Sequence, residues 1–270
     1  MSDEPRTVYT HGHHESVLRG HRRRTAQDSA GYLLPRLRPG LSVLDIGCGP
    51  GTITADLAAL VEPGEVTAVE VTDDALNLAR AEAQRREVSN ISFVTADVHA
   101  LDFPDDAFDV VHAHQVLQHV ADPVQALREM RRVCVPGGVV AVRDADYAGF
   151  IWYPRVDALD RWLALYTEAA RANGGEPDAG RRLLSWARQA GFADITPTAS
   201  MWCYATEETR DWWGGMWADR IVHSDLAHQL VRSGMATTAE LEEISSGWRR
   251  WSLAPDGWFA IPNGEILCRA

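Results

Sequence analysis

The segment VLDIGCGPGT, from Val43 to Thr52, combines an acid with three glycines in a spacing that can bind a ligand. A strand-like run ends near Asp45, and Gly47, Gly49 and Gly51 then alternate before a helical pattern begins. Glycine permits positive φ and lets the backbone approach a ligand closely, while the N-terminus of the following helix presents free N–H groups. The segment therefore predicts a nucleotide-like cofactor at the carboxyl end of this strand, with a purely structural turn as the alternative.

Two further acids follow later strand-like runs and are expected to meet the same ligand. Glu70 closes the run VTAVEV, where a carboxylate can accept hydrogen bonds from both ribose hydroxyls, and Asp97 follows FVTADV, where it can accept from an adenine amino group. Dinucleotide folds usually carry G-x-G-x-x-G, whereas this turn reads G-x-G-x-G. A site with these carboxylates would repel a pyrophosphate but suits a sulfonium and an ammonium group. The pattern predicts a site for an adenosine that carries no phosphate.

A cluster of histidines precedes the first strand. The stretch YTHGHHESVLRGH, from Tyr9 to His21, holds four of the ten histidines of the chain. A metal site needs several converging ligands, and the nearly adjacent His11, His13 and His14 show no familiar ligand spacing. Three interpretations of the cluster are therefore considered: a metal site, a solvated tail and a lid over the active site. We favour the lid and predict no metal.

The first half of the chain alternates strand and helix signals. Strand-length apolar runs bounded by Gly, Pro or Asp lie at Ser42–Ile46, Val66–Val71, Ile91–Val94, Phe108–His112 and Val139–Arg143. Helical patterns lie at Arg24–Leu37, Thr52–Val61, Asp73–Arg86 and Pro123–Val133. This alternation predicts a parallel sheet with helices on both faces.

The composition changes after about residue 150, because all ten tryptophans fall between Trp152 and Trp258. Helical patterns dominate this part, at Val156–Ala172, Ala179–Ala190, Glu207–Ile221 and Thr238–Trp251. Two strand-like segments remain, Ile195–Tyr204 and Trp258–Arg269. We predict an α/β, Rossmann-like, seven-stranded and mostly parallel sheet, divided into an N-terminal lid segment (1–25), a cofactor-binding core (26–150) and a final part (151–270). That final part holds the last strands and a helical, Trp-rich substrate cap.

Composition excludes several classes of function. The net charge of −12 disfavours a nucleic acid or an anionic membrane as partner, and no apolar run reaches the roughly 20 residues that span a bilayer. The chain has no lysine, which removes Schiff-base chemistry. The four cysteines form no CxxC pair, and the N-terminus lacks the pattern of a secretory signal. We expect a cytoplasmic monomer or homodimer whose partner is a small molecule.

The run from Leu44 to Asp144 resembles the class I S-adenosylmethionine-dependent methyltransferases, especially the ubiquinone/menaquinone-biosynthesis type and its small-molecule relatives. The matching segments are VLDIGCGPG, VTAVEVTDDAL, FVTADVHALDFPDDAFDVVHAHQVLQHVADP and LREMRRVCVPGGVVAVRD. The resemblance implies S-adenosyl-L-methionine as cofactor, with Asp45 and the glycine turn holding its methionine portion. It further implies that Glu70 holds the ribose and Asp97 the adenine.

The resemblance also implies that the segment His114–Gln115 lies beside the sulfonium. The predicted cofactor-binding residues are Arg24, Asp45, Gly47, Gly49, Gly51, Thr52, Glu70, Val71, Asp97, Val98 and His114. The predicted catalytic residues are His14, His119 and Asp144, and the predicted substrate-binding residues are Tyr9, His11, Gln115, Trp152 and Trp213. Packing is the alternative role for His119 and for the tryptophans. Arg24 is predicted to bind the carboxylate of the cofactor, because arginine pairs well with that group.

The expected activity is methyl transfer to a small aromatic or heterocyclic metabolite, with carbon favoured over nitrogen or oxygen as the acceptor and natural-product biosynthesis as the setting. A methyltransferase acting on protein or another macromolecule and a non-catalytic S-adenosylmethionine-binding protein are the alternatives. An oxidoreductase would share the half-sheet but not the glycine spacing.

Overall fold

One eight-stranded sheet organises the computed structural model, which describes Gly20, His21 and residues 23–270. The strands are β1 (Val43–Ile46), β2 (Val66–Glu70), β3 (Ile91–Thr95), β4 (Phe108–His114), β5 (Cys134–Ala145), β6 (Ile151–Tyr153), β7 (Ile195–Tyr204) and β8 (Trp258–Arg269). Their order is β3-β2-β1-β4-β5-β8-β6, and β7 also pairs with β8. Pairs among β1 to β5 are parallel, whereas β5, β6 and β7 each run antiparallel to β8. The predicted mostly parallel α/β sheet is confirmed, with one short strand more than expected.

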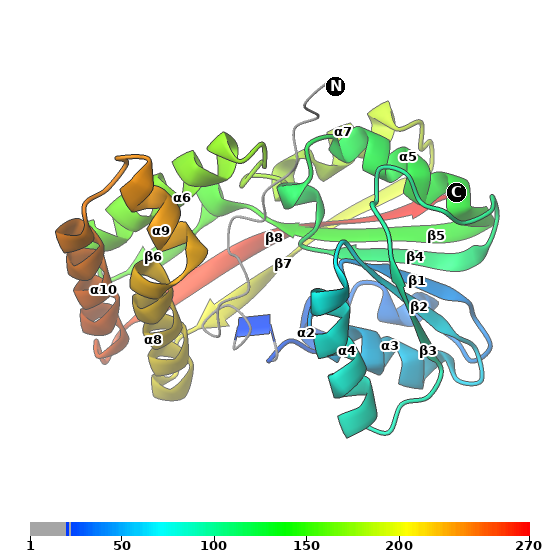
Figure 1. Ribbon diagram of the computed structural model, residues 1–270, viewed down its shortest axis with the longest axis horizontal. Helices are drawn as coiled ribbons and strands as arrows, with labels where there is room; N and C mark the ends of the chain where they lie inside the picture. Colours follow the sequence, from blue (N-terminus) through cyan, green and yellow to red (C-terminus); the bar gives the residue numbers. More distant parts are fainter. Residues whose placement is uncertain (1–19, 22) are drawn as a thin grey trace.

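Helices cover both faces of the sheet (Figure 1). One side carries α2 (Ala26–Ser29), α3 (Thr52–Val61) and α4 (Asp73–Arg85), and the other carries α5 (Pro123–Val133) and α7 (Leu183–Gln189). Short 3-10 turns occur at η1 (Leu34–Arg36), η2 (Leu117–His119), η3 (Tyr147–Gly149) and η4 (Gly180–Arg182). Local sequence fixes several helix starts, because Thr72 and Asp122 cap α4 and α5 with their side-chain oxygens.

The remaining helices form a cap at the far end of the long β7–β8 pair (Figure 1). They are α6 (Asp157–Ala172), α8 (Glu207–His223), α9 (Asp225–Arg232) and α10 (Thr238–Ser252). The short strand β6 pairs with the Trp258–Ala260 end of β8, beyond the part of β8 that pairs with β5. The cap is therefore attached to the sheet by continuous backbone pairing.

Three local predictions differ from the structure. The helix expected at Arg24–Leu37 is only the single turn α2 followed by η1, because Pro35 lacks a backbone donor and restricts the residue before it. The helix expected at Ala179–Ala190 is divided into η4 and α7. Strand β6 and helix α9 were missed, since three and eight residues are too short for a clear period.

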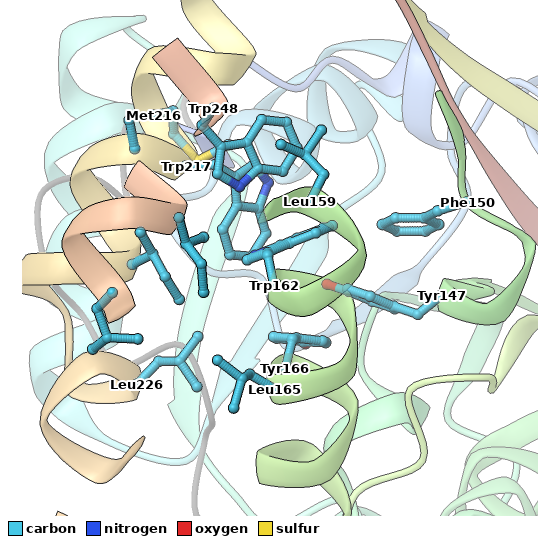
Figure 2. Packing of buried hydrophobic residues seen from close by; sticks show 14 of the residues in the cluster. Tyr147, Phe150, Leu159, Trp162, Leu165, Tyr166, Met216, Trp217, Leu226 and Trp248 are labelled. Carbon is cyan, nitrogen blue, oxygen red and sulfur yellow. The ribbon is translucent and has the colours of Figure 1, made fainter. Parts of the chain in front are cut away.

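The cap has its own aromatic core (Figure 2). A separate, mainly aliphatic core lies under the sheet. Trp162 is fully buried there, with the rings of Trp217 and Trp248 meeting it edge-on at centroid distances of 4.5 and 4.9 Å. Such aromatic pairs add roughly 0.5–1.5 kcal/mol each beyond the burial of their area. Most of the tryptophans in the cap are therefore structural.

Candidate active site

The glycine turn joins β1 to α3 at the carboxyl edge of the parallel strands. Gly51 caps α3 with a φ of 80°, and a Cβ placed there would lie 2.9 Å from the Cα of Ala79 on α4. Gly49 has a φ of 54°, and a Cβ placed there would have nothing within 4 Å. Gly51 is thus required for packing, whereas Gly49 leaves its backbone open to a ligand.

The other two predicted residues of the turn also take part in it. Gly47 donates its N–H to the carbonyl of Val69 (2.8 Å), and Thr52 begins α3 just beyond the turn. The N-terminal N–H groups of α3 receive no side-chain cap, so this end of the helix can donate to a carboxylate.

Asp45 lies behind the turn and is almost fully buried. Its Oδ2 accepts a hydrogen bond from Thr54 Oγ1 (2.6 Å), and its Oδ1 lies 2.7 Å from His112 Nδ1 on β4. Both carboxylate oxygens already have protein partners. The structure therefore gives Asp45 the role of fixing β1, β4 and α3 together, and its direct contact with a methionine portion stays a prediction.

The two acids predicted for the adenosine lie at the ends of neighbouring strands, β2 and β3. Glu70 Oε1 accepts the Gly49 N–H at 2.8 Å, which ties the acid to the open part of the glycine turn. Asp97 has a side chain that is 67% exposed, and its hydrogen bonds from His99 use Oδ1 only. Partial burial would raise the pKa of Asp97, but these bonds outweigh it and lower the pKa. Glu70 Oε2 also accepts the Val71 N–H at 3.3 Å, so both oxygens of Glu70 have protein donors. Contact of either acid with the adenosine stays a prediction.

Two valines accompany these acids. Val71 follows Glu70 and is 67% exposed, an unusual degree for an apolar side chain at a strand end, while Val98 is buried next to Asp97. Acceptor carboxylates beside apolar surface and an open glycine backbone fit an adenosine, whose hydroxyls and amino group donate and whose faces are apolar. The residues present thus fit the predicted cofactor.

The predicted residues His114 and Gln115 lie at the end of β4 and just after it. His114 is buried, neither of its ring nitrogens has a described partner, and burial together with Arg24 and Arg143 lowers its pKa well below the usual value. Gln115 has a φ of 55°, which is rare outside glycine, and its Oε1 accepts from Arg24 at 2.8 Å. Arg24 also stacks on Trp202, with 5.1 Å between the guanidinium carbon and the ring centroid.

A cavity of about 250 Å³ lies between the sheet and the cap, with Gln115 in its wall. Aromatic side chains line it from three elements: η3 with the residue that follows it, β7, and α8. They are Tyr147, Phe150, Trp202, Tyr204, Trp212, Trp213 and Trp217. The charged lining residues are Arg23, Arg24, Asp28 and Arg220. The predicted substrate residue Trp213 stacks on Tyr204 with ring centroids 4.5 Å apart. Gln115, which directly follows β4, brings this cavity next to the carboxyl edge of the parallel strands, and such a concavity with aromatic walls and a few polar groups is typical of a ligand site.

Three predicted residues do not reach the cavity. Trp152 is buried in the cap core against Phe259. Asp144 is fully buried and holds η2 by accepting the Gln118 N–H (3.1 Å), while burial raises its pKa to about 7. His119 is partly buried at the end of η2, and its pKa is lowered to about 3 by burial and by Arg24. Trp152 as a substrate residue, and Asp144 and His119 as catalytic residues, are therefore not supported by their positions.

The predicted residues Tyr9, His11 and His14 lie outside the described residues. The first described residues, Gly20 and His21, line the cavity. Among the residues that the structure describes, no group of three or more His, Cys, Asp or Glu could hold a metal ion. No described helix has the length and apolarity needed to cross a bilayer.

Sequence reasoning missed Arg220, which lines the cavity from α8 and is only 5% exposed. Its guanidinium lies over the Trp217 ring at 4.6 Å. The signal was present, because Trp213, Trp217 and Arg220 follow one another at helical spacing on one face. It was hidden by the expectation that an arginine on a helix is solvated.

Comparison with known proteins decides the family. Residues 37–191 match the family model described as a methyltransferase domain, and the chain is 36% identical to an uncharacterized methyltransferase of Schizosaccharomyces pombe over 96% of this chain and 95% of that protein. The chain belongs to the methyltransferase family. It is an S-adenosylmethionine-dependent methyltransferase, as the sequence resemblance predicted.

Relatives of this methyltransferase match different shares of the chain. The ubiquinone/menaquinone biosynthesis C-methyltransferase UbiE of Shewanella oneidensis is 42% identical over 107 residues, which are 39% of this chain and 43% of that protein. The YcgJ protein of Bacillus subtilis shares the fold, with a TM-score of 0.58 and 20% identity over 88% of this chain and 97% of that one.

Proposed function

We propose that this methyltransferase acts on a small aromatic or heterocyclic molecule, with a ring carbon favoured over nitrogen or oxygen as the methyl acceptor. The observation that carries the proposal is the cavity of about 250 Å³, to whose walls seven aromatic side chains contribute. Aromatic walls bind planar rings by offset or edge-on contact. The preference for carbon rests on the similarity to UbiE, whose name describes a C-methyltransferase.

The chain would hold the cofactor at the glycine turn and at Glu70 and Asp97. When bound, S-adenosylmethionine supplies an electrophilic methyl group: the acceptor atom bonds to the methyl carbon, the electron pair of the broken carbon–sulfur bond stays on sulfur, and the proton lost from a ring-carbon acceptor passes to water. Gln115 would connect the cofactor edge to the cavity. Its backbone N–H donates to the Arg143 carbonyl at 2.7 Å, and its side-chain oxygen accepts from Arg24. These two hydrogen bonds hold the strained backbone of Gln115 in place, so that its side-chain amide would stay between the cofactor site and the substrate cavity.

Positioning and exclusion of water would be the main contribution of the protein. Trp213, Tyr204 and Trp217 would fix the ring of the substrate, and holding two reactants in line can supply roughly 7–11 kcal/mol of the barrier. The predicted bases His119 and Asp144 lie outside the cavity, so we assign them positioning roles for η2.

We also propose that the predicted lid segment, residues 1–25 with Tyr9, His11 and His14, closes over the substrate. Its last described residues line the cavity, which supports this assignment. Deletion of residues 1–15 should leave the melting temperature nearly unchanged and reduce turnover steeply, because the pocket would stay wet. Turnover at the wild-type rate would contradict the lid. A cytoplasmic location, a place in natural-product biosynthesis, and a monomeric or homodimeric state stay predictions.

A turnover assay with methyl-labelled S-adenosylmethionine tests the proposal. Indoles, quinols, phenols, proteins and RNA are offered in parallel, and mass spectrometry locates the added methyl group. We expect label in an aromatic small molecule, and loss of that product in Trp213→Ala at unchanged S-adenosylhomocysteine binding. Label confined to protein or RNA would favour a macromolecular substrate, and binding without any turnover would favour a non-catalytic cofactor-binding protein.

A further inference from the structure

The charge of the cavity differs from that of the chain. The whole chain carries a net charge of −12, yet three arginines, Arg23, Arg24 and Arg220, line the cavity together with one acid, Asp28. Asp28 is exposed and already serves α2, because its Oδ1 accepts from the Thr25 N–H at 3.0 Å. Because Arg23 is paired with Glu208, the positive balance in the described lining comes from Arg24 and Arg220 against Asp28.

The lining also holds hydrogen-bond donors that could meet an acceptor of a ligand. Trp213 is 8% exposed, and its Nε1–H has no acceptor among the described residues. The Gln115 amide has its oxygen engaged by Arg24, which leaves its NH₂ group as a donor. Buried donors gain most from an acceptor supplied by a ligand, since a buried donor without a hydrogen bond carries a desolvation cost.

Arg220 is held in a geometry that suits an anion. It lies inside the wall of the cavity rather than at the rim, and it is stacked on Trp217. A guanidinium has five N–H donors, so it can bind an acidic group in addition to the contacts that it already makes. Arg23 differs from Arg220, because it is exposed at the rim and paired with Glu208 at 2.6 Å.

We propose that the substrate is a planar aromatic acid, bound as its anion, with the acidic oxygen at Arg220 and the ring between the aromatic walls of the cavity. The inference rests on the proposed function and adds the charge of the substrate to it. The field of Arg24 and Arg220 stabilises a carboxylate or a phenolate, and a phenolate also makes its ring more electron-rich and thus more nucleophilic.

Calorimetry with matched naphthalene probes tests this inference on the full chain saturated with S-adenosylhomocysteine. 2-Naphthoate and 2-naphthamide share the ring and differ in charge. We expect the acid to bind at least about tenfold more tightly than the amide, a difference of roughly 1.4 kcal/mol. Arg220→Gln should bring this ratio close to one, Arg220→Lys should restore part of it, and the matched rim variant Arg23→Gln should keep it.

A spectroscopic titration identifies the acidic group. The ionisable groups around the probe are His21, Arg23, Arg24, Asp28, Tyr147, Cys203, Tyr204 and Arg220. If the site binds a phenolate, absorbance should show that bound 2-naphthol ionises at a pH about one unit lower than free 2-naphthol does. Arg220→Gln should abolish this shift. Tighter 2-naphthoate binding with unshifted 2-naphthol would assign a carboxylate instead.

The results that overturn the inference differ from those that overturn the proposed function. Equal affinity for 2-naphthoate and 2-naphthamide would refute the anionic substrate and leave an aromatic substrate in place. An anion preference that survives Arg220→Gln would refute the assigned site. If neither probe binds while S-adenosylhomocysteine does, the aromatic substrate itself is wrong, and the inference fails with it.

Discussion

The proposed cofactor edge and the proposed substrate cavity are built from different kinds of residue. At the proposed cofactor edge, the backbone at Gly49 and two carboxylates at strand ends would make the binding surface, and the aliphatic core under the sheet supports them. At the cavity, the surface is made by aromatic rings of η3, β7 and α8 and by arginines of α8 and of the segment before α2, and the core of the cap behind it is aromatic. A common cofactor thus calls for fixed backbone geometry, whereas an individual substrate is selected by side chains that a helix can exchange one at a time.

Removing a central ring should give the largest change in stability. Trp162→Ala leaves a cavity among Trp217, Trp248 and Phe259, and it should lower the free energy of unfolding by about 3–5 kcal/mol. Urea denaturation measures this change, and Trp258→Ala at the partly exposed end of β8 is the matched control with a smaller loss. Folded Trp162→Ala should bind S-adenosylhomocysteine normally. A tenfold loss of that affinity would show that the cap and the cofactor edge are not separable.

Alanine at Gly51 and at Gly49 should separate packing from ligand binding within one turn. Both substitutions impose a left-handed residue that costs about 1–2 kcal/mol. Gly51→Ala adds a clash with Ala79 and should lose about 2–4 kcal/mol of stability in total. Gly49→Ala meets no protein atom, so it should lose only the smaller amount while weakening cofactor binding about tenfold or more. Denaturation and calorimetry on both variants would contradict the assignment if their effects were interchanged.

Asp144, at the end of β5, should make stability depend on pH. Its pKa in the folded protein is about 7, above the ordinary value of 3.8, so folding takes up a proton between these values. The stability that this raised pKa gives to the folded protein is fully present below pH 4 and is lost as the pH rises through 7. The wild type should therefore lose about 1–3 kcal/mol from this group between pH 5 and 8. Asp144→Asn should flatten that part of the profile, and an unchanged slope would assign the pH dependence to other groups.

The two regions also differ in how far the sequence predicted them. The glycine turn, Glu70 and Asp97 were placed correctly relative to one another, because the carboxyl ends of neighbouring parallel strands meet at one edge. The partners of Asp45 were not foreseen, since Thr54 and His112 reach it only through the packing of α3 and β4. The position of Asp45 two residues before Gly47 did not predict either contact.

In the cap, the tryptophan content predicted aromatic walls but not which rings form them. Trp213 was expected at the substrate and lines the cavity, whereas Trp152 was expected there and packs in the core. The difference is set by β6, a three-residue strand whose pairing with β8 turns Trp152 toward Phe259. Arg220 was missed for a related reason, because burial of a charged helix residue depends on tertiary contacts that local sequence does not contain.

Calorimetric titration with S-adenosylhomocysteine of the wild type, Glu70→Ala, Asp97→Ala and Trp213→Ala tests the division of labour between the two regions most directly. We predict one site per chain in the wild type and a loss of about tenfold or more in each acid variant, since a hydrogen bond to a charged acceptor is worth about 1.5–3 kcal/mol. Trp213→Ala should bind S-adenosylhomocysteine like the wild type. Unchanged affinity in both acid variants, or a comparable loss in Trp213→Ala, would contradict the division.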